Sequence, residues 1–214
     1  MRWISMAAVC VLLSVGHSAW SQSKSKAVLR DPPDTHPQYF PEGIFHDSSE
    51  SGWFQGFKER WYAKHLRSMR EPSLSEASTD NSLIAYRFLW LRTFHSPIAI
   101  RLIIHVDGTG TLTGKMTNGK GGYNAGNLTR NESHELTKAQ VAEFLGLLRR
   151  ASFWSALSED GTGGVDGAQW VLEGVENGHY HIVDRWSPKK SDFEHVCLFL
   201  FGQSRISVDA KEIY

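Results

Sequence analysis

Hydrophobic and polar positions between residues 83 and 116 predict three consecutive antiparallel strands. Residues 83–94 carry apolar side chains on both faces, with Arg87 among them, which is typical of a central strand covered on both sides. Residues 98–106 alternate between apolar and polar positions, and the pattern resumes after a turn. An odd-numbered loop keeps one face apolar, so we predict a three-residue loop with a bulge that sets Ile104 opposite Leu112.

The segment 168–186 predicts a second hairpin. Two strand-like stretches flank Asn177-Gly178, a dipeptide that favours a tight two-residue turn. Counting outward from this turn gives the expected cross-strand pairs, which are Glu176 with His179, Gly174 with His181, and Leu172 with Val183.

Three segments have the spacing of helices. Residues 51–70 place aromatic and apolar side chains near one face and basic side chains on much of the rest. Thr137 and Gln140 form a capping box ahead of an apolar stripe. Residues 191–203 form a nearly continuous apolar run, for which we expect a final helix, with a buried strand as the alternative.

Together these elements predict an α+β fold. The order is helix, three strands, helix, two strands, helix, with the glycine-rich segment 118–127 expected to be a mobile loop. We therefore expect an antiparallel sheet of about five strands, made of two hairpin units, with helices packed mainly on one side. Residues 51–214 would form this single domain.

The N-terminal pattern is that of a secretory signal. Residues 1–21 combine a basic tip, a short apolar run and small residues near Ser21, and the apolar run is shorter than a membrane span requires. Residues 22–50 contain several prolines and predict an extended or disordered arm. We expect an exported protein, periplasmic or extracellular after cleavage near Ser21, and monomeric.

Charge and cysteine content narrow the function. Acidic and basic residues are equal in number, so the chain lacks the basic footprint of a nucleic-acid-binding protein. Cys197 would be the only cysteine left after signal cleavage, and its apolar neighbours predict a buried, unreactive side chain. The basic, aromatic helix at 51–70 leaves membrane-surface contact open, although a helix docked on its own domain with a solvated basic face is the commoner explanation.

A candidate metal site lies beside the turn of the second hairpin. His179 and His181 project from the same face of a strand, and Glu176 would lie opposite His179. Two imidazoles and a carboxylate make a partial shell for zinc. Exposed histidines beside a turn with no metal are the alternative.

A candidate anion site lies on the strands. Arg87, Arg101, His105 and Arg185 are strand residues that would attract an anionic ligand if one sheet face gathered them. The alternative is that they are solvated or form salt bridges to Glu173 and Asp184.

No catalytic motif is present, so the leading hypothesis is an exported, non-catalytic binding or interaction domain. Its partner would be a protein or a small anionic ligand; no cofactor is expected, and zinc is the one alternative. Trp90, Trp170 and Trp186 are expected to pack in the core or at its rim, with an aromatic binding surface for a protein or sugar as the alternative. One alternative is an exported metal-dependent hydrolase using His179 and His181, and another is a peripheral membrane protein held by helix 51–70.

Overall fold

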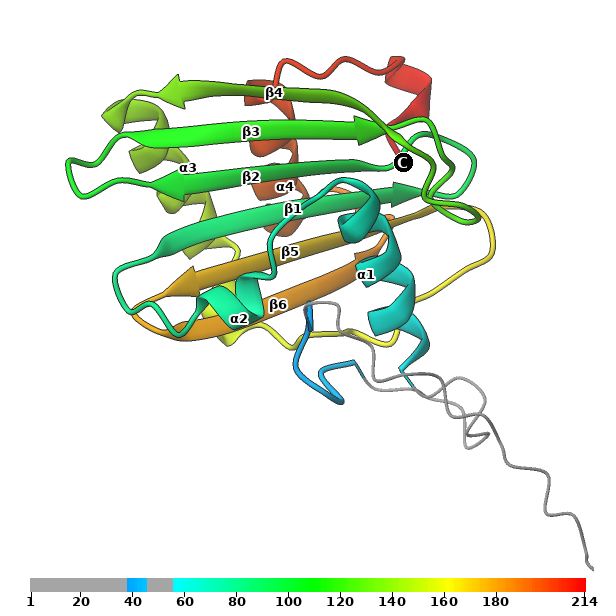
Figure 1. The fold of residues 1–214 in the computed structure, drawn as a ribbon, viewed down its shortest axis with the longest axis horizontal. Helices are drawn as coiled ribbons and strands as arrows, with labels where there is room; N and C mark the ends of the chain where they lie inside the picture. Colours follow the sequence, from blue (N-terminus) through cyan, green and yellow to red (C-terminus); the bar gives the residue numbers. More distant parts are fainter. Residues whose placement is uncertain (1–37, 46–55) are drawn as a thin grey trace, which may run out of the picture. The chain divides into compact units, whose positions relative to one another are not determined.

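The computed structural model describes residues 38–45 and 56–214, which belong to one compact unit, His36–Tyr214 (Figure 1). Its helices are α1 (Phe57–Ser68), α2 (Leu74–Ala77), α3 (Lys138–Arg150) and α4 (Asp192–Gln203). Its strands are β1 (Ile84–Arg92), β2 (Ile98–Ile104), β3 (Gly110–Thr117), β4 (Leu128–Leu136), β5 (Ala168–Glu176) and β6 (His179–Trp186). The expected α+β class is confirmed.

The strands form one antiparallel sheet in the order β4-β3-β2-β1-β5-β6. β1 lies in the middle and is buried on both faces, as its doubly apolar sequence predicts. The expected sheet of about five strands lacks β4, an edge strand whose side chains are mostly exposed on both faces. Such a strand shows no alternation of apolar and polar positions, and this is why the sequence pattern missed it.

The hairpin between β2 and β3 has the expected three-residue loop, but it lies one residue closer to β2 than expected, which shifts the strand pairing by two residues. His105 N donates to Thr109 O at 2.8 Å, and Gly108 N donates to His105 O at 2.9 Å, so the loop is residues 106–108. Gly108 has a φ of 85°, which glycine adopts without strain. Ile104 therefore pairs with Gly110 and not with Leu112, but the face that each side chain occupies is unchanged.

The second hairpin has the expected register at all three pairs. Asn177 and Gly178 both have positive φ, 52° and 76°, as a two-residue turn of this handedness requires. The observed partners are Glu176 with His179, Gly174 with His181, and Leu172 with Val183.

One face of the sheet packs against α3 and α4 and holds an aromatic core. Trp90 and Trp170 are fully buried there with ring centroids 5.1 Å apart, and Cys197 of α4 is buried in the same core. The expected capping box begins α3, since Thr137 Oγ1 accepts from Gln140 N while Gln140 Oε1 accepts from Thr137 N.

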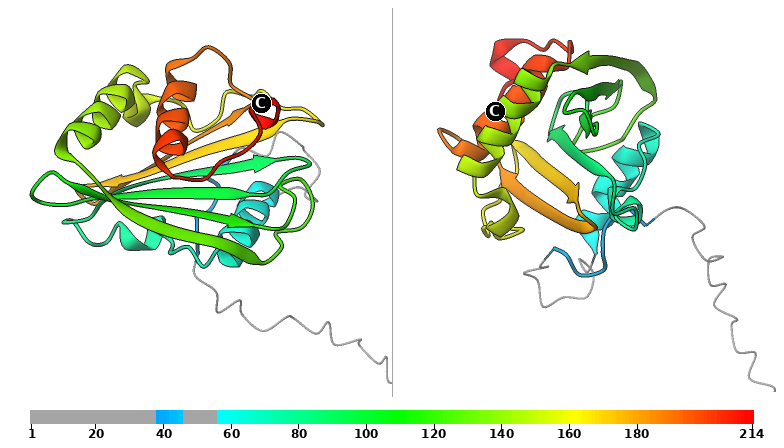
Figure 2. Two further views of the ribbon diagram at one scale, coloured as in Figure 1. Left: turned by 90° about the horizontal axis from the view of Figure 1, so that it is seen from above. Right: turned by 90° about the vertical axis from the view of Figure 1, so that its left-hand side faces the viewer.

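The other face packs against α1, α2 and the segment 38–45, so helices cover both faces of the sheet (Figure 2). Helix α1 is expected within 51–70, and its buried Tyr62 and Leu66 contact this face together with Met69, which follows the last residue of the helix. Residues 38–45, at the end of the segment expected to be an extended arm, contribute three buried rings to the same cluster, those of Tyr39, Phe40 and Phe45.

The signal segment 1–21 and the arm as far as residue 37 lie outside the described residues. Within the described residues, no helix is long and apolar enough to cross a membrane.

Candidate binding pocket

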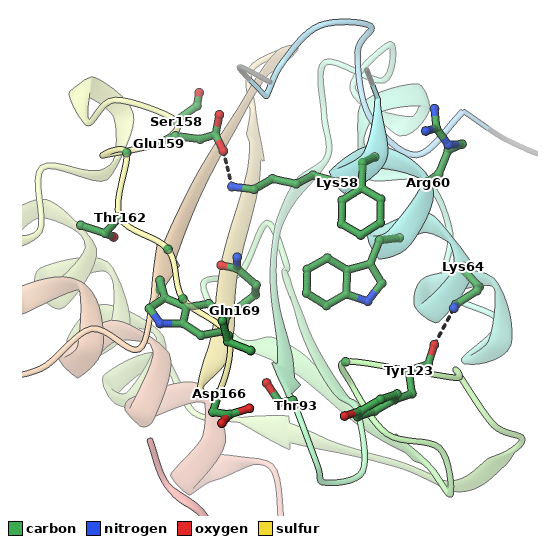
Figure 3. Close-up of a pocket in the computed structure, with 18 of the residues that line it drawn as sticks. Lys58, Arg60, Lys64, Thr93, Tyr123, Ser158, Glu159, Thr162, Asp166 and Gln169 are labelled. Carbon is green, nitrogen blue, oxygen red and sulfur yellow. Dashed lines mark hydrogen bonds and ion pairs between the residues drawn. The ribbon is translucent and has the colours of Figure 1, made fainter. Parts of the chain in front are cut away.

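An open pocket of about 1160 Å³ lies on the α1 face of the sheet, at one end of the strands (Figure 3). One wall is α1, and the opposite wall is the segment 157–166 between the short helical turn Phe153–Ser155 and β5. Thr93, Gln169 and Trp186 line it from the ends of β1, β5 and β6. Antiparallel pairing brings these three ends together, and the resulting volume is slightly above the range of about 300–1,000 Å³ that is typical of small-molecule sites.

The loop between β3 and β4 fastens α1 in place. Trp61 Nε1 donates to Gly121 O, and Lys64 Nζ donates to Tyr123 O, both at 2.8 Å. The loop itself is bound to the end of β1, because Gly121 N donates to Arg92 O at 3.0 Å. A Cβ at Gly121 would lie 2.5 Å from Arg92 O, so only glycine permits this approach. The glycine-rich loop expected to be mobile is therefore extensively hydrogen-bonded.

Lys58 connects the two walls of the pocket. Its Nζ lies 2.8 Å from Asp184 Oδ2 on β6 and also contacts Glu159 in the segment 157–166. Tyr62 donates to the same Asp184 oxygen at 2.9 Å. One lysine on α1 therefore holds both a strand and the loop wall through charge-assisted hydrogen bonds.

The protonation states of Lys58 and Tyr62 argue against either side chain acting as a nucleophile. Burial alone would lower the pKa of Lys58, but Asp184 and Glu159 outweigh it and raise the pKa above its usual range. Burial, with the charge of Asp184, raises the pKa of Tyr62 well above its usual value. Lys58 is therefore a protonated cation and Tyr62 a neutral donor, and neither has the depressed pKa that an activated nucleophile needs.

Gln169 and Trp186 are cross-strand partners in this end of the sheet. Gln169 is 6 % exposed, and its side-chain amide has no hydrogen-bond partner among the described residues. Figure 3 shows its amide end directed into the space between α1 and the segment 157–166. A Cβ on Gly164 would lie 2.5 Å from Trp186 Nε1, so the glycine backbone of this segment packs directly on the indole.

Large exposed apolar side chains are concentrated at the pocket. Eight large apolar side chains are exposed in the described part of the chain, and four of them line this pocket. These four are Phe57, Tyr123, Leu157 and Val165. Their exposed fractions run from 47 % for Phe57 to 87 % for Val165. Clustered exposed apolar side chains mark interaction sites more often than scattered ones do.

The structure brings together two of the four candidate anion-binding residues. Arg87 and Arg101 are cross-strand partners on β1 and β2, but the chain's own Glu71 occupies the space between them. Glu71 Oε2 lies 2.9 Å from Arg101 Nε and 3.6 Å from Arg87 Nη1, and Glu71 Oε1 lies 2.8 Å from Lys115 Nζ. This buried cluster is an anion site already filled by a carboxylate.

A second carboxylate completes the cluster. Glu173, opposite Arg87 on β5, accepts from Arg87 Nε at 2.7 Å and from Tyr180 OH at 2.9 Å. Burial alone would raise the pKa of Glu71, but Arg87, Arg101 and Lys115 outweigh burial and lower it. Arg87 thus forms the salt bridge to Glu173 that the sequence offered as the alternative to ligand binding.

The other two candidates of the anion site lie elsewhere. His105 is at the β2–β3 turn, where its Nε2 contacts Thr111 Oγ1 at 2.8 Å. Arg185 points away from the α1 face, and its guanidinium donates to Leu157 O at 2.9 Å. The four residues therefore do not form one ligand site.

The candidate metal ligands are not gathered into a metal shell. His181 Nε2 lies 3.1 Å from Ala156 O, and its ring packs against Phe153. Glu176 accepts a hydrogen bond from Tyr86 OH at 3.0 Å, while His179 is exposed. Across residues 38–45 and 56–214, no group of three histidine, cysteine or acidic side chains could hold a metal ion.

Sequence reasoning missed most of the pocket. Lys58 and Trp61 were assigned to a basic and an aromatic helix face, and Gln169 drew no attention. The available signal was the segment 157–166, which combines exposed Leu157 and Val165 with three glycines. An apolar residue in a glycine-rich loop has little core to join, so its exposure could have been expected.

No protein-family model matches the chain, and neither the curated proteins nor the solved structures contain a significant match.

Proposed function

We propose that this protein is an exported, non-catalytic binding domain whose ligand occupies the pocket between α1 and the segment 157–166. The observation that carries the proposal is the concentration of exposed apolar side chains at the pocket, which includes half of those exposed in the described residues. Leaving them in water is unfavourable, and a ligand that covers them recovers that free energy. Export is proposed from the N-terminal pattern alone.

The chemistry of the walls supports binding over catalysis. Lys58 is neutralised by two carboxylates, and Tyr62 is held as a neutral donor. The metal-dependent hydrolase gains no support, since His181 is directed to a backbone carbonyl and to aromatic rings. The membrane-surface alternative gains none either, because the apolar stripe of α1 packs against the sheet.

The proposal is tested by ligand-induced stabilisation of the full chain. Short peptides, oligosaccharides and small anions are screened for a rise in the thermal midpoint, because a ligand that binds only the folded state stabilises it. The double variant Leu157→Ser with Val165→Ser should weaken any ligand found by about tenfold or more. Both side chains are highly exposed, so we expect stability to change by less than about 0.5 kcal/mol.

Val106→Ser is the matched control. Val106 is as exposed as Val165 but lies in the β2–β3 turn and does not line the pocket, so its replacement should leave binding unchanged. A ligand whose affinity is the same in the double variant would contradict the proposal. So would the absence of stabilisation by all three ligand classes, or substrate turnover that is lost when a lining residue is replaced.

A further inference from the structure

The side-chain amide of Gln169 is a polar group without a partner in a nearly closed position. Its residue is 94 % buried, since 6 % is exposed, and no described residue hydrogen-bonds to its amide. A carboxamide offers two donors and a two-lone-pair acceptor, and a folded protein rarely leaves such a group buried and unpaired. The amide is not sealed off, because Gln169 lines the pocket and its end is directed there (Figure 3). Its hydrogen-bonding partner, water or a ligand, therefore comes from the pocket.

The hydrogen-bonding pattern of Gln169 is complementary to that of a main-chain amide. The oxygen of a carboxamide accepts from an N–H while its nitrogen donates to a C=O, so one glutamine can pair with both polar groups of a peptide segment. A ligand that presents only negative charge would use the nitrogen alone and leave the oxygen unpaired.

The apolar side chains at the pocket distinguish between ligands that carry both a hydrogen-bond donor and a hydrogen-bond acceptor. Leu157 and Val165 on the loop wall are aliphatic and highly exposed, and Phe57 faces the pocket from α1. Aliphatic side chains complement the apolar side chains of an extended peptide, which project at regular intervals to either side of its backbone. Sugar hydroxyls would lose hydrogen bonds to water against Leu157 and Val165, and these two side chains offer none in return.

The charge of the lining adds no preference for a charged polymer. The cations are Lys58, Arg60 and Lys64, and the carboxylates are Glu159 and Asp166. Lys58 is already paired with Glu159 and Asp184, so the charges are close to balance. This balance suits a ligand held by apolar contacts and neutral hydrogen bonds.

We infer that the pocket takes an extended polypeptide segment with apolar side chains, one of whose main-chain amide groups pairs with the carboxamide of Gln169. The inference rests on the proposed function and specifies the class of ligand and the residue that forms hydrogen bonds to it. The partner is a protein or peptide that presents such a segment.

The experiment selects ligands for the full chain from a displayed library of random short peptides and, in parallel, from an array of oligosaccharides. The affinity of a selected synthetic peptide is then measured on the wild type and on Gln169→Met, which keeps the volume of the side chain and removes its hydrogen bonds. We expect Gln169→Met to weaken the peptide by about tenfold, the value of one to two neutral hydrogen bonds. Its thermal midpoint should be unchanged or higher, whereas a structural role of Gln169 would lower it.

Methylating the peptide's main-chain nitrogens one at a time locates the amide group that pairs with Gln169. One methylated position should weaken binding to the wild type by about tenfold and have no further effect in Gln169→Met. Equal losses in both proteins at every position would overturn the role of Gln169.

Two glycine variants separate failure of this inference from failure of the proposed function. A Cβ on either Gly163 in the loop wall or Gly202 on α4 meets no atom within 4 Å, so both positions tolerate a large side chain. Gly163→Trp should abolish binding and Gly202→Trp should not. Oligosaccharides that bind in a Gly163→Trp-sensitive way, with no peptides selected, would overturn the ligand class and leave the binding pocket standing. Peptides that bind Gly163→Trp as well as the wild type would overturn both.

Discussion

The two faces of the sheet are built from opposite kinds of interaction. The face under α3 and α4 is an aromatic and aliphatic core, and among its buried strand residues only Arg92 is charged. The face under α1 and α2 buries four charged strand residues, which are Arg87, Lys115, Glu173 and Asp184. Buried charges are costly unless they are paired, so the second face depends on a particular set of partners, whereas the first depends on volume. The pocket lies on the face that depends on partners.

Removal of Glu71 should have the largest effect, because it leaves the buried Arg87 and Lys115 and the partly buried Arg101 without their shared carboxylate. We expect Glu71→Ala to lower the free energy of unfolding by about 4 kcal/mol, as measured by denaturant titration. Acetate should restore part of the loss in the variant and have no effect on the wild type, since it can occupy the vacated anion site. A loss below about 1 kcal/mol would mean that the cluster behaves like a solvated surface pair.

Truncating a side chain on the other face should cost less stability, and that cost should not depend on added ions. Leu172 is fully buried in the core under α3 and α4, and Leu172→Ala should cost about 3 kcal/mol through lost contacts and a cavity. The same denaturant titration with and without acetate should give the same loss. Recovery of Leu172→Ala by acetate would remove the contrast between the faces.

The pH dependence of stability should reveal the buried histidine of the α1 face. His65 is fully buried, and neither ring nitrogen has a hydrogen-bond partner among the described residues. Burial, followed by the charge of Lys64, lowers its pKa from 6.5 to about 4. The folded state therefore binds fewer protons than the unfolded state, so this stabilisation is complete above pH 6.5 and is lost as the pH falls toward 4.

His65→Gln removes this titration. Between about pH 7 and about pH 4.5, the wild type should lose between about 2 and 3 kcal/mol more stability than the variant. Unfolding by denaturant at the two pH values gives the difference. Parallel losses in the two proteins would show that His65 titrates in the fold as it does in the unfolded chain.

Elements that are fixed by local interactions could be predicted from the sequence. The Asn177-Gly178 turn set the register of β5 and β6 correctly because the turn geometry is local. The parity of the β2–β3 loop was also local, although the loop lies one residue earlier in the chain than expected. β4 was missed because an edge strand with both faces exposed has no apolar period.

The site depends on partners far apart along the chain, which the sequence does not reveal. Lys58 meets Asp184 from 126 positions away, and Arg101 meets Glu71 in the connection that follows α1. The sequence identified Arg87 and Arg101 as possible anion ligands, but not the carboxylate that fills the space between them. Gln169 could not have been singled out either, because what distinguishes it is the partner that it lacks.

The smallest expected loss of stability comes from removing the N-terminal cap of α3, on the apolar face. Thr137→Ala removes the side chain that accepts from Gln140 N at the start of α3, and it should cost about 1 kcal/mol. Thr137→Ser keeps the hydroxyl and should recover most of that stability. Because the cap involves no ionised group, the cost should be the same with acetate and at both pH values, unlike the effects at Glu71 and His65. A cost that changed with pH would mean that α3 is coupled to the charged face through the sheet, and that the two faces do not act independently.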